Sequence, residues 1–155
     1  MTQIHQLGTT HGLTVLSVSD FQDKDLIARA ETGQLPAIDL IISCGDLPPE
    51  YLTFLKERLE SPLFYVKGNH DIRYTPSNLA GCENIHGRVV QKGSLNILGI
   101  EGSMWYNGGP NQYTEPQMKK ILFWTGLRNR RMGHKHVERS LSPVAQSGPQ
   151  QDFLH

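Results

Sequence analysis

The stretch DLIISCGD, residues 39–46, decides the fold class of this chain of 155 residues. Its run of Leu and Ile is short and apolar, as in a buried strand, and it leads directly into a glycine and an aspartate. Two similar runs, LTVLSVS at 13–19 and LFYV at 63–66, lie on either side of it along the chain and also end in polar segments. The sequence therefore predicts three buried strands with polar residues at their ends.

Two helices are predicted between these strands. The first spans about 23–32 and is ended by Gly33 and Pro36. The second opens at Pro48 and Pro49, where a missing backbone N–H costs nothing. Strand–helix–strand units form right-handed crossovers and imply a parallel sheet covered by helices. We therefore expect an α/β fold whose ligands gather at the carboxyl ends of the strands.

Beyond these units, the pattern predicts a hairpin and then a loop. Strands over 84–90 and 95–100, joined by a turn at Lys92-Gly93, are close enough in sequence to pair directly. The Gly- and Asn-rich loop 102–116 follows, near the expected edge of the site. Its aromatic residues, Tyr106 among them, are candidates for substrate contact, although such loops more often form simple turns.

The end of the chain has a different character. A helix is expected over about 115–124, and after Gly126 large apolar residues are few and no strand is recognisable. Gly, Pro, Ser and Gln dominate the last stretch, a composition typical of disorder. The expected division is therefore a polar leader at 1–12, one domain at 13–125 and a basic, disordered tail at 126–155.

Composition limits the classes of function. No run of about 18 apolar residues predicts a membrane span, and the first dozen residues lack the apolar core of a signal peptide, so we expect a cytoplasmic protein with no membrane partner. Residues 1–118 carry 8 Lys and Arg against 13 Asp and Glu, whereas residues 119–155 carry 7 against 2. The basic end has no interleaved aromatic residues, which makes nucleic-acid binding the less favoured interpretation.

Oxygen-bearing side chains follow each of the three strands. Asp20 follows the first, Asp46 the second, and Asn69 with His70 the third, at spacings of about one strand–helix unit. Clustered carboxylates repel one another unless a cation or a shared proton lies between them. A carboxylate that bridges two cations is the hallmark of two-metal hydrolysis. The sequence therefore predicts a metal site or a proton-sharing pair at this edge.

Four segments in this order resemble the motifs of one family. They are Ser19-Asp20-Phe21-Gln22, Cys44-Gly45-Asp46-Leu47, Gly68-Asn69-His70-Asp71 and, less securely placed, Gly133-His134-Lys135-His136. The pattern is similar to that of the calcineurin-like metallophosphoesterase superfamily, which carries D-x-H, G-D, G-N-H-[DE], a lone His and G-H-x-H. The resemblance covers about residues 13–124. It implies an α/β layered sandwich of metallophosphoesterase type, incomplete at its C-terminal end.

The resemblance also implies roles for individual residues. Asp20 would bind a first metal, Asp46 would bridge both metals and Asn69 would bind the second through its amide oxygen. His70 would face the phosphate and protonate the leaving oxygen, and Asp71 would orient His70.

In the last motif, His134 would bind the second metal and His136 the first. The cofactors would be two divalent ions of Mn, Fe, Zn or Co, and the substrate a phosphoester small molecule or a nucleotide.

Two departures separate this chain from the family pattern. Gln22 stands where the family usually has His, and no histidine between Asp71 and Gly133 fits the lone-His ligand, since His86 begins a strand candidate. The change of pattern near residue 124 favours a frameshifted or interrupted reading frame, or an internal deletion that kept the last motif. We expect low stability and reduced activity in either case.

Three functions remain open from the sequence. The first is a hydrolase of phosphomonoesters or phosphodiesters that uses two divalent metals. The second is a scaffold that keeps the fold and binds a protein partner, favoured by Gln22 and the missing histidine. The intact run Gly68-Asn69-His70-Asp71 argues against it. The third is a nucleic-acid-binding module that uses the basic tail.

Overall fold

A five-stranded sheet in the order β1-β2-β3-β4-β5 forms the centre of the computed structural model, which describes the backbone of residues 3–7 and 12–140 and the side chains of residues 12–127. Strands β2 (Leu13–Val18), β3 (Leu40–Ser43) and β4 (Leu63–Tyr65) pair in parallel. The fold is therefore mixed α/β with a parallel sheet, as the sequence predicts.

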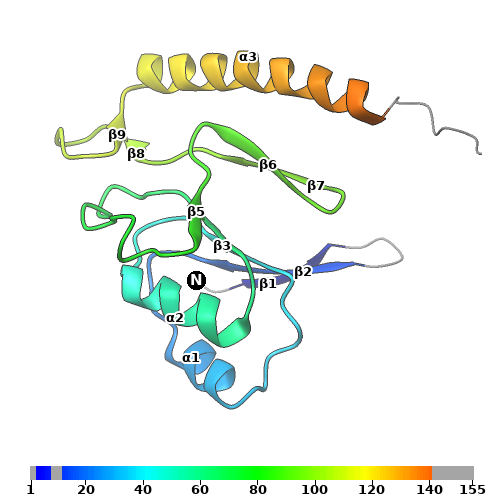
Figure 1. Cartoon of the computed structure of the whole chain (residues 1–155). Helices are drawn as coiled ribbons and strands as arrows, with labels where there is room; N and C mark the ends of the chain where they lie inside the picture. The colour runs from blue at the N-terminus through cyan, green and yellow to red at the C-terminus, as the bar shows by residue number, and fades with distance from the viewer. Residues whose placement is uncertain (1–2, 8–11, 141–155) are drawn as a thin grey trace, which may run out of the picture.

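Helices α1 (Lys24–Glu31) and α2 (Pro49–Leu59) connect these strands and lie on one face of the sheet (Figure 1). The Asp23 side chain caps α1 by accepting hydrogen bonds from the backbone N–H groups of Asp25 and Leu26, at 2.9 and 3.2 Å. Pro48 and Pro49 open α2, as expected. Because the strands follow one another in sheet order, right-handed crossovers place both helices on the same face.

The alternation of side chains along the strands creates two separate clusters of apolar residues. One cluster faces the helices and contains Leu16, Ile41 and Leu63 from the sheet with Leu26, Leu52 and Leu55 from the helices. The other lies on the opposite face and contains Val15, Leu40, Phe64 and Ile85. Strand β2 contributes Leu16 to the first and Val15 to the second, because successive side chains point to opposite faces.

A hairpin of β6 (Arg88–Lys92) and β7 (Leu95–Gly99) covers the second face. The hairpin confirms the sequence prediction, but the expected strand 84–90 is wrong as a single element. Its first residue, Asn84, is the last residue of β5 (Cys82–Asn84), which pairs in parallel with β4, whereas its last residues belong to β6. Gly87 separates the two pieces with a left-handed φ of 64°, which lets the chain leave the sheet and begin the hairpin.

Other elements differ from the expectations. The stretch expected to be a polar leader contains β1 (Gln3–Leu7), which pairs antiparallel with β2, and the loop 102–116 contains the short parallel pair β8 (Ser103–Met104) and β9 (Gln112–Tyr113). Helix α3 (Glu115–Ser140) contacts β6 and β9 and continues well past residue 124.

The backbone of residues 126–140 is therefore helical, where the sequence favours disorder, and it crosses the expected domain boundary at 125. The rest of the expected tail, 141–155, lies outside the described residues. Across the described ranges, no helix is long and apolar enough to span a membrane.

Candidate metal centre

The candidate residues lie where β2, β3 and β4 end side by side. Val18 pairs with Ser43, which pairs with Tyr65, so the three strands finish in register. Backbone pairing continues beyond the strand ends, because Asp20 N–H donates to Gly45 O at 3.1 Å. Neighbouring loops therefore deliver Asp20, Asp46 and the segment 68–71 to the carboxyl edge of the sheet, the edge where ligands of such sheets gather.

Both candidate aspartates occupy the left-handed region of the backbone. Asp20 has a φ of 60° and Asp46 a φ of 58°. This conformation is uncommon for a residue with a side chain and costs about 1–2 kcal/mol. Two such residues on neighbouring loops mean that the surrounding contacts hold both aspartates in place.

Two glycines let the loops approach each other closely. A Cβ at Gly45 would collide with the backbone N of Gly68, and a Cβ at Gly68 would collide with the Asp46 carboxylate. Gly45 also has a φ of 101°, which favours glycine. Gly45 and Gly68, the glycines of the G-D and G-N-H-D segments, are thus required by the contact between the second loop, which follows β3, and the third loop, which follows β4.

The side chain of Asp71 links these two loops through hydrogen bonds to the backbone of each. Only 5% of its surface is exposed, and its Oδ2 accepts hydrogen bonds from Asp46 N–H at 2.7 Å and Gly68 N–H at 2.8 Å. A buried carboxylate needs such partners. Its expected role in orienting His70 stays a prediction, whereas its contacts give it a structural role that the motif alone did not indicate.

Tyr74 closes the base of the site. Its hydroxyl donates to Leu47 O at 2.7 Å, and its ring packs edge-on against Tyr65 at 5.5 Å between centroids. Burial raises the pKa of the Tyr74 phenol, and the nearby Asp71 carboxylate raises it further. The phenol therefore stays protonated and keeps donating to Leu47, the residue that follows Asp46.

Asp46 borders two cavities. One, of about 540 Å³, is also lined by Asp20, Gln22 and Lys24. The other, of about 180 Å³, is also lined by His70, Asp71 and Arg73. The Asp46 carboxylate reaches toward the third loop as well, because its Oδ1 accepts from His70 N–H at 2.9 Å. Asp46 is thus the residue shared by the two halves of the site.

Asn69 has a partner that the sequence analysis missed. Its side-chain Nδ2 donates to the hydroxyl of Tyr106 at 2.8 Å. Tyr106 belongs to the loop 102–116 and is 56% exposed. The only signal in the sequence was the aromatic character of that loop, since 37 residues separate the two partners.

The donor chemistry suits a cation bound mainly by oxygen. Within the described part of the chain, no three His, Cys, Asp or Glu side chains gather as a metal ion would require. Asp20, Gln22 and Asp46 nevertheless line one cavity, and their side chains carry oxygen donors of the kind that suits a hard cation such as Mn²⁺ better than Zn²⁺.

The expected nitrogen donors are placed only by their backbone. His134 and His136 fall within α3, and their side chains lie outside the described residues, so their assignment as ligands stays a prediction. His86 is occupied elsewhere, because its Nδ1 accepts from Glu101 N–H at 3.0 Å. Compared with models of known protein families, the chain gives no match, and compared with curated protein sequences it gives none either.

Proposed function

We propose that the chain is a metal-dependent phosphoesterase that hydrolyses phosphomonoesters or phosphodiesters, including nucleotides, at the edge formed by β2, β3 and β4. The observation that carries the proposal is the position of Asp46 between two cavities, with Asp20 lining one and His70 the other. A carboxylate in this position suits the bridging ligand of a two-metal centre.

Each group would have a distinct part. Asp20, Asp46 and Gln22 would hold one cation, and Asn69 would contribute its amide oxygen to a second. Divalent cations supply charge stabilisation for the phosphate and activate water for attack when they are bound.

His70 would protonate the leaving oxygen, because an imidazole can transfer a proton as a general acid and His70 lines the cavity shared with Asp46.

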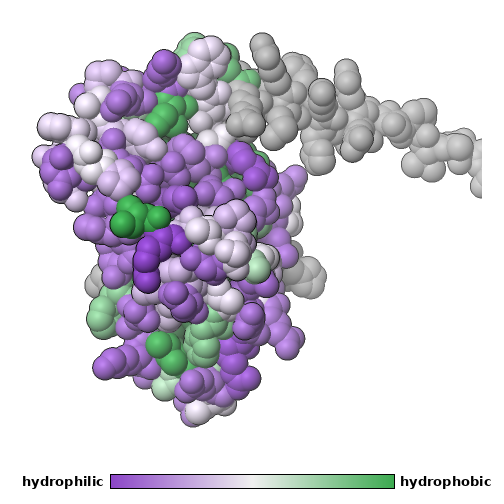
Figure 2. Space-filling model, turned by 60° about the vertical axis from the view of Figure 1, so that its left-hand side comes forward, coloured by the Kyte–Doolittle hydropathy of each residue, from purple (hydrophilic) through white to green (hydrophobic). Residues whose placement is uncertain are grey.

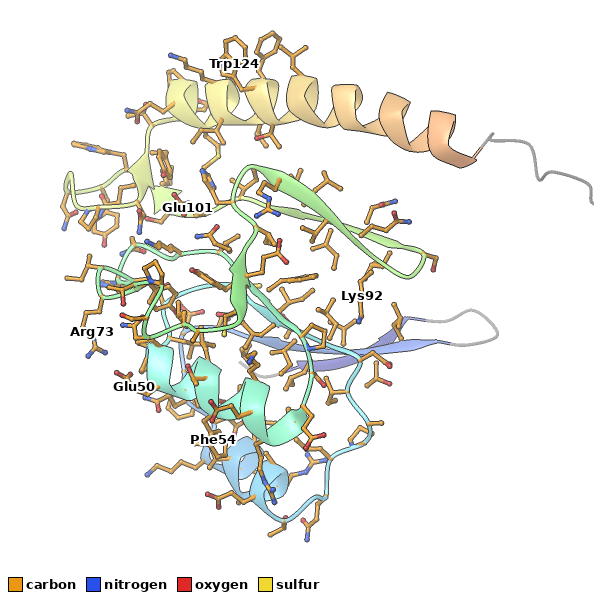
Figure 3. The ribbon with its side chains drawn as sticks, in the orientation of Figure 1. Glu50, Phe54, Arg73, Lys92, Glu101 and Trp124 are labelled. Atoms are coloured by element: carbon orange, nitrogen blue, oxygen red, sulfur yellow. The ribbon has the colours of Figure 1, made fainter. Side chains whose placement is uncertain are left out.

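Two cationic side chains line these cavities and would suit an anionic substrate. Lys24 lines the larger cavity and Arg73 lines the smaller one. Arg73 lies at the same end of the molecule as Glu50 in the first turn of α2 (Figure 3). The side chains of Lys24 and Arg73 would bind phosphate oxygens, since an Arg guanidinium and a Lys ammonium are common phosphate partners.

A scaffold that has lost turnover is the alternative. Gln22 in place of the family histidine favours it, because an amide oxygen binds transition metals more weakly than an imidazole does. The cavity lined by Asp46, His70 and Asp71 argues for the enzyme, since a protein-binding scaffold has no chemical need for a histidine and two carboxylates around one cavity.

The deciding experiment is hydrolysis of a chromogenic phosphodiester and a chromogenic phosphomonoester by purified protein with Mn²⁺. Asp46→Asn keeps the shape of the side chain and removes its charge, so we expect it to lower kcat/KM by about a hundredfold or more. The matched control is Asp25→Asn, because Asp25 is an exposed residue of α1 whose ion pair with Arg29 is also exposed.

Activity that Asp46→Asn abolishes and Asp25→Asn preserves supports the enzyme. Wild-type protein that is folded by circular dichroism and has no activity above the Asp46→Asn background contradicts the proposal and leaves the scaffold.

A further inference from the structure

The larger cavity beside Asp46, of about 540 Å³, is lined by residues of two kinds. The polar part of the lining includes Asp20, Lys24 and Asp46, and the apolar part consists of Phe21, Ile27 and Pro48. The function proposed above uses the polar part and gives the apolar part no role. The volume falls within the roughly 300–1,000 Å³ of sites that enclose whole small molecules, so the cavity has room for more than a phosphate group.

Phe21 is the most exposed apolar residue of this lining. Its exposed fraction is 63%, and it belongs to neither of the two apolar clusters that cover the faces of the sheet. Ile27, by contrast, packs against the cluster on the helix side. The side chain of Phe21 is therefore not used in packing the core. An aromatic ring of this kind offers a flat apolar face on which another planar group can stack.

The backbone on both sides holds Phe21 in place. Before it, Asp20 N–H donates to Gly45 O at 3.1 Å. Phe21 N–H itself donates to Ser19 O at 2.6 Å. After it, Asp23 caps α1 through backbone N–H groups of the first turn. Phe21 thus lies between two anchored points, and a residue whose position is set before binding loses less conformational freedom when a ligand arrives.

We propose that the substrate of this centre is a phosphoester that carries a planar aromatic group, as nucleoside phosphates do, and that this group stacks on the ring of Phe21. The inference rests on the function proposed above and names its substrate class. Lys24 supplies positive charge for the phosphate in the polar part of the cavity, while the apolar part removes the aromatic group from water. A phosphoester without such a group, a sugar phosphate for example, meets the same polar residues and gains nothing from Phe21.

The test uses two substrates that share one phosphoester bond. They are adenosine monophosphate and the ribose phosphate that remains when its base is removed. Release of inorganic phosphate with Mn²⁺ gives kcat/KM for each, and the ratio of the two values measures what the base contributes. We expect a ratio of about ten or more in the wild type and a ratio about tenfold lower in Phe21→Ala, because stacking of a base on an aromatic side chain is worth about a factor of ten or more.

Two further variants separate stacking from general damage. Phe21→Trp keeps an aromatic face and should keep the ratio within about twofold of the wild type. Phe123→Ala is the matched control, because Phe123 is 62% exposed and lines neither cavity beside Asp46. An equal ratio in the wild type and Phe21→Ala overturns the inference, as does an equal fall in Phe21→Ala and Phe123→Ala.

The outcomes also separate the inference from the proposed function. Wild-type protein that hydrolyses phosphoesters while Phe21→Ala leaves the ratio unchanged overturns the stacking role alone. Titration calorimetry with the same two molecules and Mn²⁺ decides the case in which the wild type hydrolyses neither. Tighter binding of adenosine monophosphate that Phe21→Ala removes then supports an aromatic subsite in a protein that does not turn over these phosphoesters. Equal binding of the two molecules, or no binding of either, overturns the subsite.

Discussion

The loops at the ends of β2, β3 and β4 and the outer face of α3 are built in opposite ways. In the loops, a Cβ added at Gly68 would collide with Asp46, and the buried Asp71 carboxylate holds two backbone amides. On α3, a Cβ at Gly126 meets nothing within 4 Å, and Phe123 is 62% exposed and Trp124 59% exposed.

Figure 2 shows a mainly hydrophilic surface interrupted by separate hydrophobic patches. The loops at the strand ends are therefore specified by contact with one another. On the outer face of α3, by contrast, Phe123 and Trp124 pack edge-on against each other at 5.7 Å between ring centroids and stay more than half exposed. The variants below test this contrast, beginning with the largest expected effect.

Replacing one glycine by alanine in each region should change the free energy of unfolding in opposite directions. Gly68→Ala forces the Asp46 carboxylate or the backbone of the second loop to move, so we expect the free energy of unfolding to fall by about 3 kcal/mol. The matched change, Gly126→Ala, adds a methyl group to open space within a helix and should raise it by about 0.5–1 kcal/mol. Urea denaturation measures both, and a similar loss in the two variants would refute the contrast.

A nitrogen donor placed in the loops should change the metal preference. Gln22→His puts an imidazole in the cavity of Asp20 and Asp46. We expect Zn²⁺ affinity to rise by about tenfold, or about 1.4 kcal/mol, with a smaller gain for Mn²⁺, because imidazole suits softer cations than an amide oxygen does. Calorimetric titration with each ion is the measurement. Gln117→His, on the first turns of α3, is the control and should leave both affinities unchanged.

High pH should loosen the base of the site through Tyr74. The pKa of its phenol is raised above the ordinary value of 10.0 by burial and then by Asp71, so folding favours the protonated form. This contribution is fully present below about pH 10 and is lost as the pH rises toward the folded pKa, because the unfolded tyrosine ionises first.

In Tyr74→Phe, the free energy of unfolding should therefore be lower by about 1 kcal/mol at neutral pH, because the bond to Leu47 is removed. Above pH 10, the free energy of unfolding should decline less steeply with pH than in the wild type. Urea denaturation at a series of pH values measures both the loss at neutral pH and the slope above pH 10. Tyr51, Tyr65 and Tyr113 also have raised pKa values, so the wild type and the variant must be compared directly. Identical slopes above pH 10 would contradict the assignment to Tyr74.

The smallest effect is expected on the outer face of α3. Phe123→Lys replaces an exposed aromatic side chain with a cation and should change the free energy of unfolding by less than about 0.5 kcal/mol. Thermal or urea unfolding measures this, with Thr125→Lys as the contrasting variant, since Thr125 is buried. A large loss in Phe123→Lys would mean that something covers this face.

The sequence predicted those parts of the fold in which several local signals agree. The local signals are Gly33 and Pro36 after α1, the prolines that open α2 and the apolar strand runs. All lie within a few residues of the elements that they specify. The split between β5 and β6 was missed because one glycine, Gly87, turns the chain within an otherwise continuous strand pattern. The end of α3 was missed because its composition resembles that of disordered segments.

The candidate site was predictable in its residues and not in their partners. Asp20, Asp46 and Asn69 follow from strand ends at spacings of one strand–helix unit. The partners of Asp71 are backbone N–H groups, which almost every residue has, so the residue types in the sequence do not reveal these bonds. The bond of Asn69 to Tyr106 depends on the path of a loop that begins more than thirty residues later, as the separation of 37 residues shows.

The carboxylate of Asp71 has a consequence for the timing of local motion. The amide protons of Asp46 and Gly68 lie in loops, where exchange with solvent is usually rapid, yet both are held by one buried oxygen atom. Neither loop can open without breaking a bond that also restrains the other. Their hydrogen exchange should therefore be slow and nearly equal, as in a single cooperative unit, and the second and third strand-end loops should exchange on the timescale of the sheet beneath them.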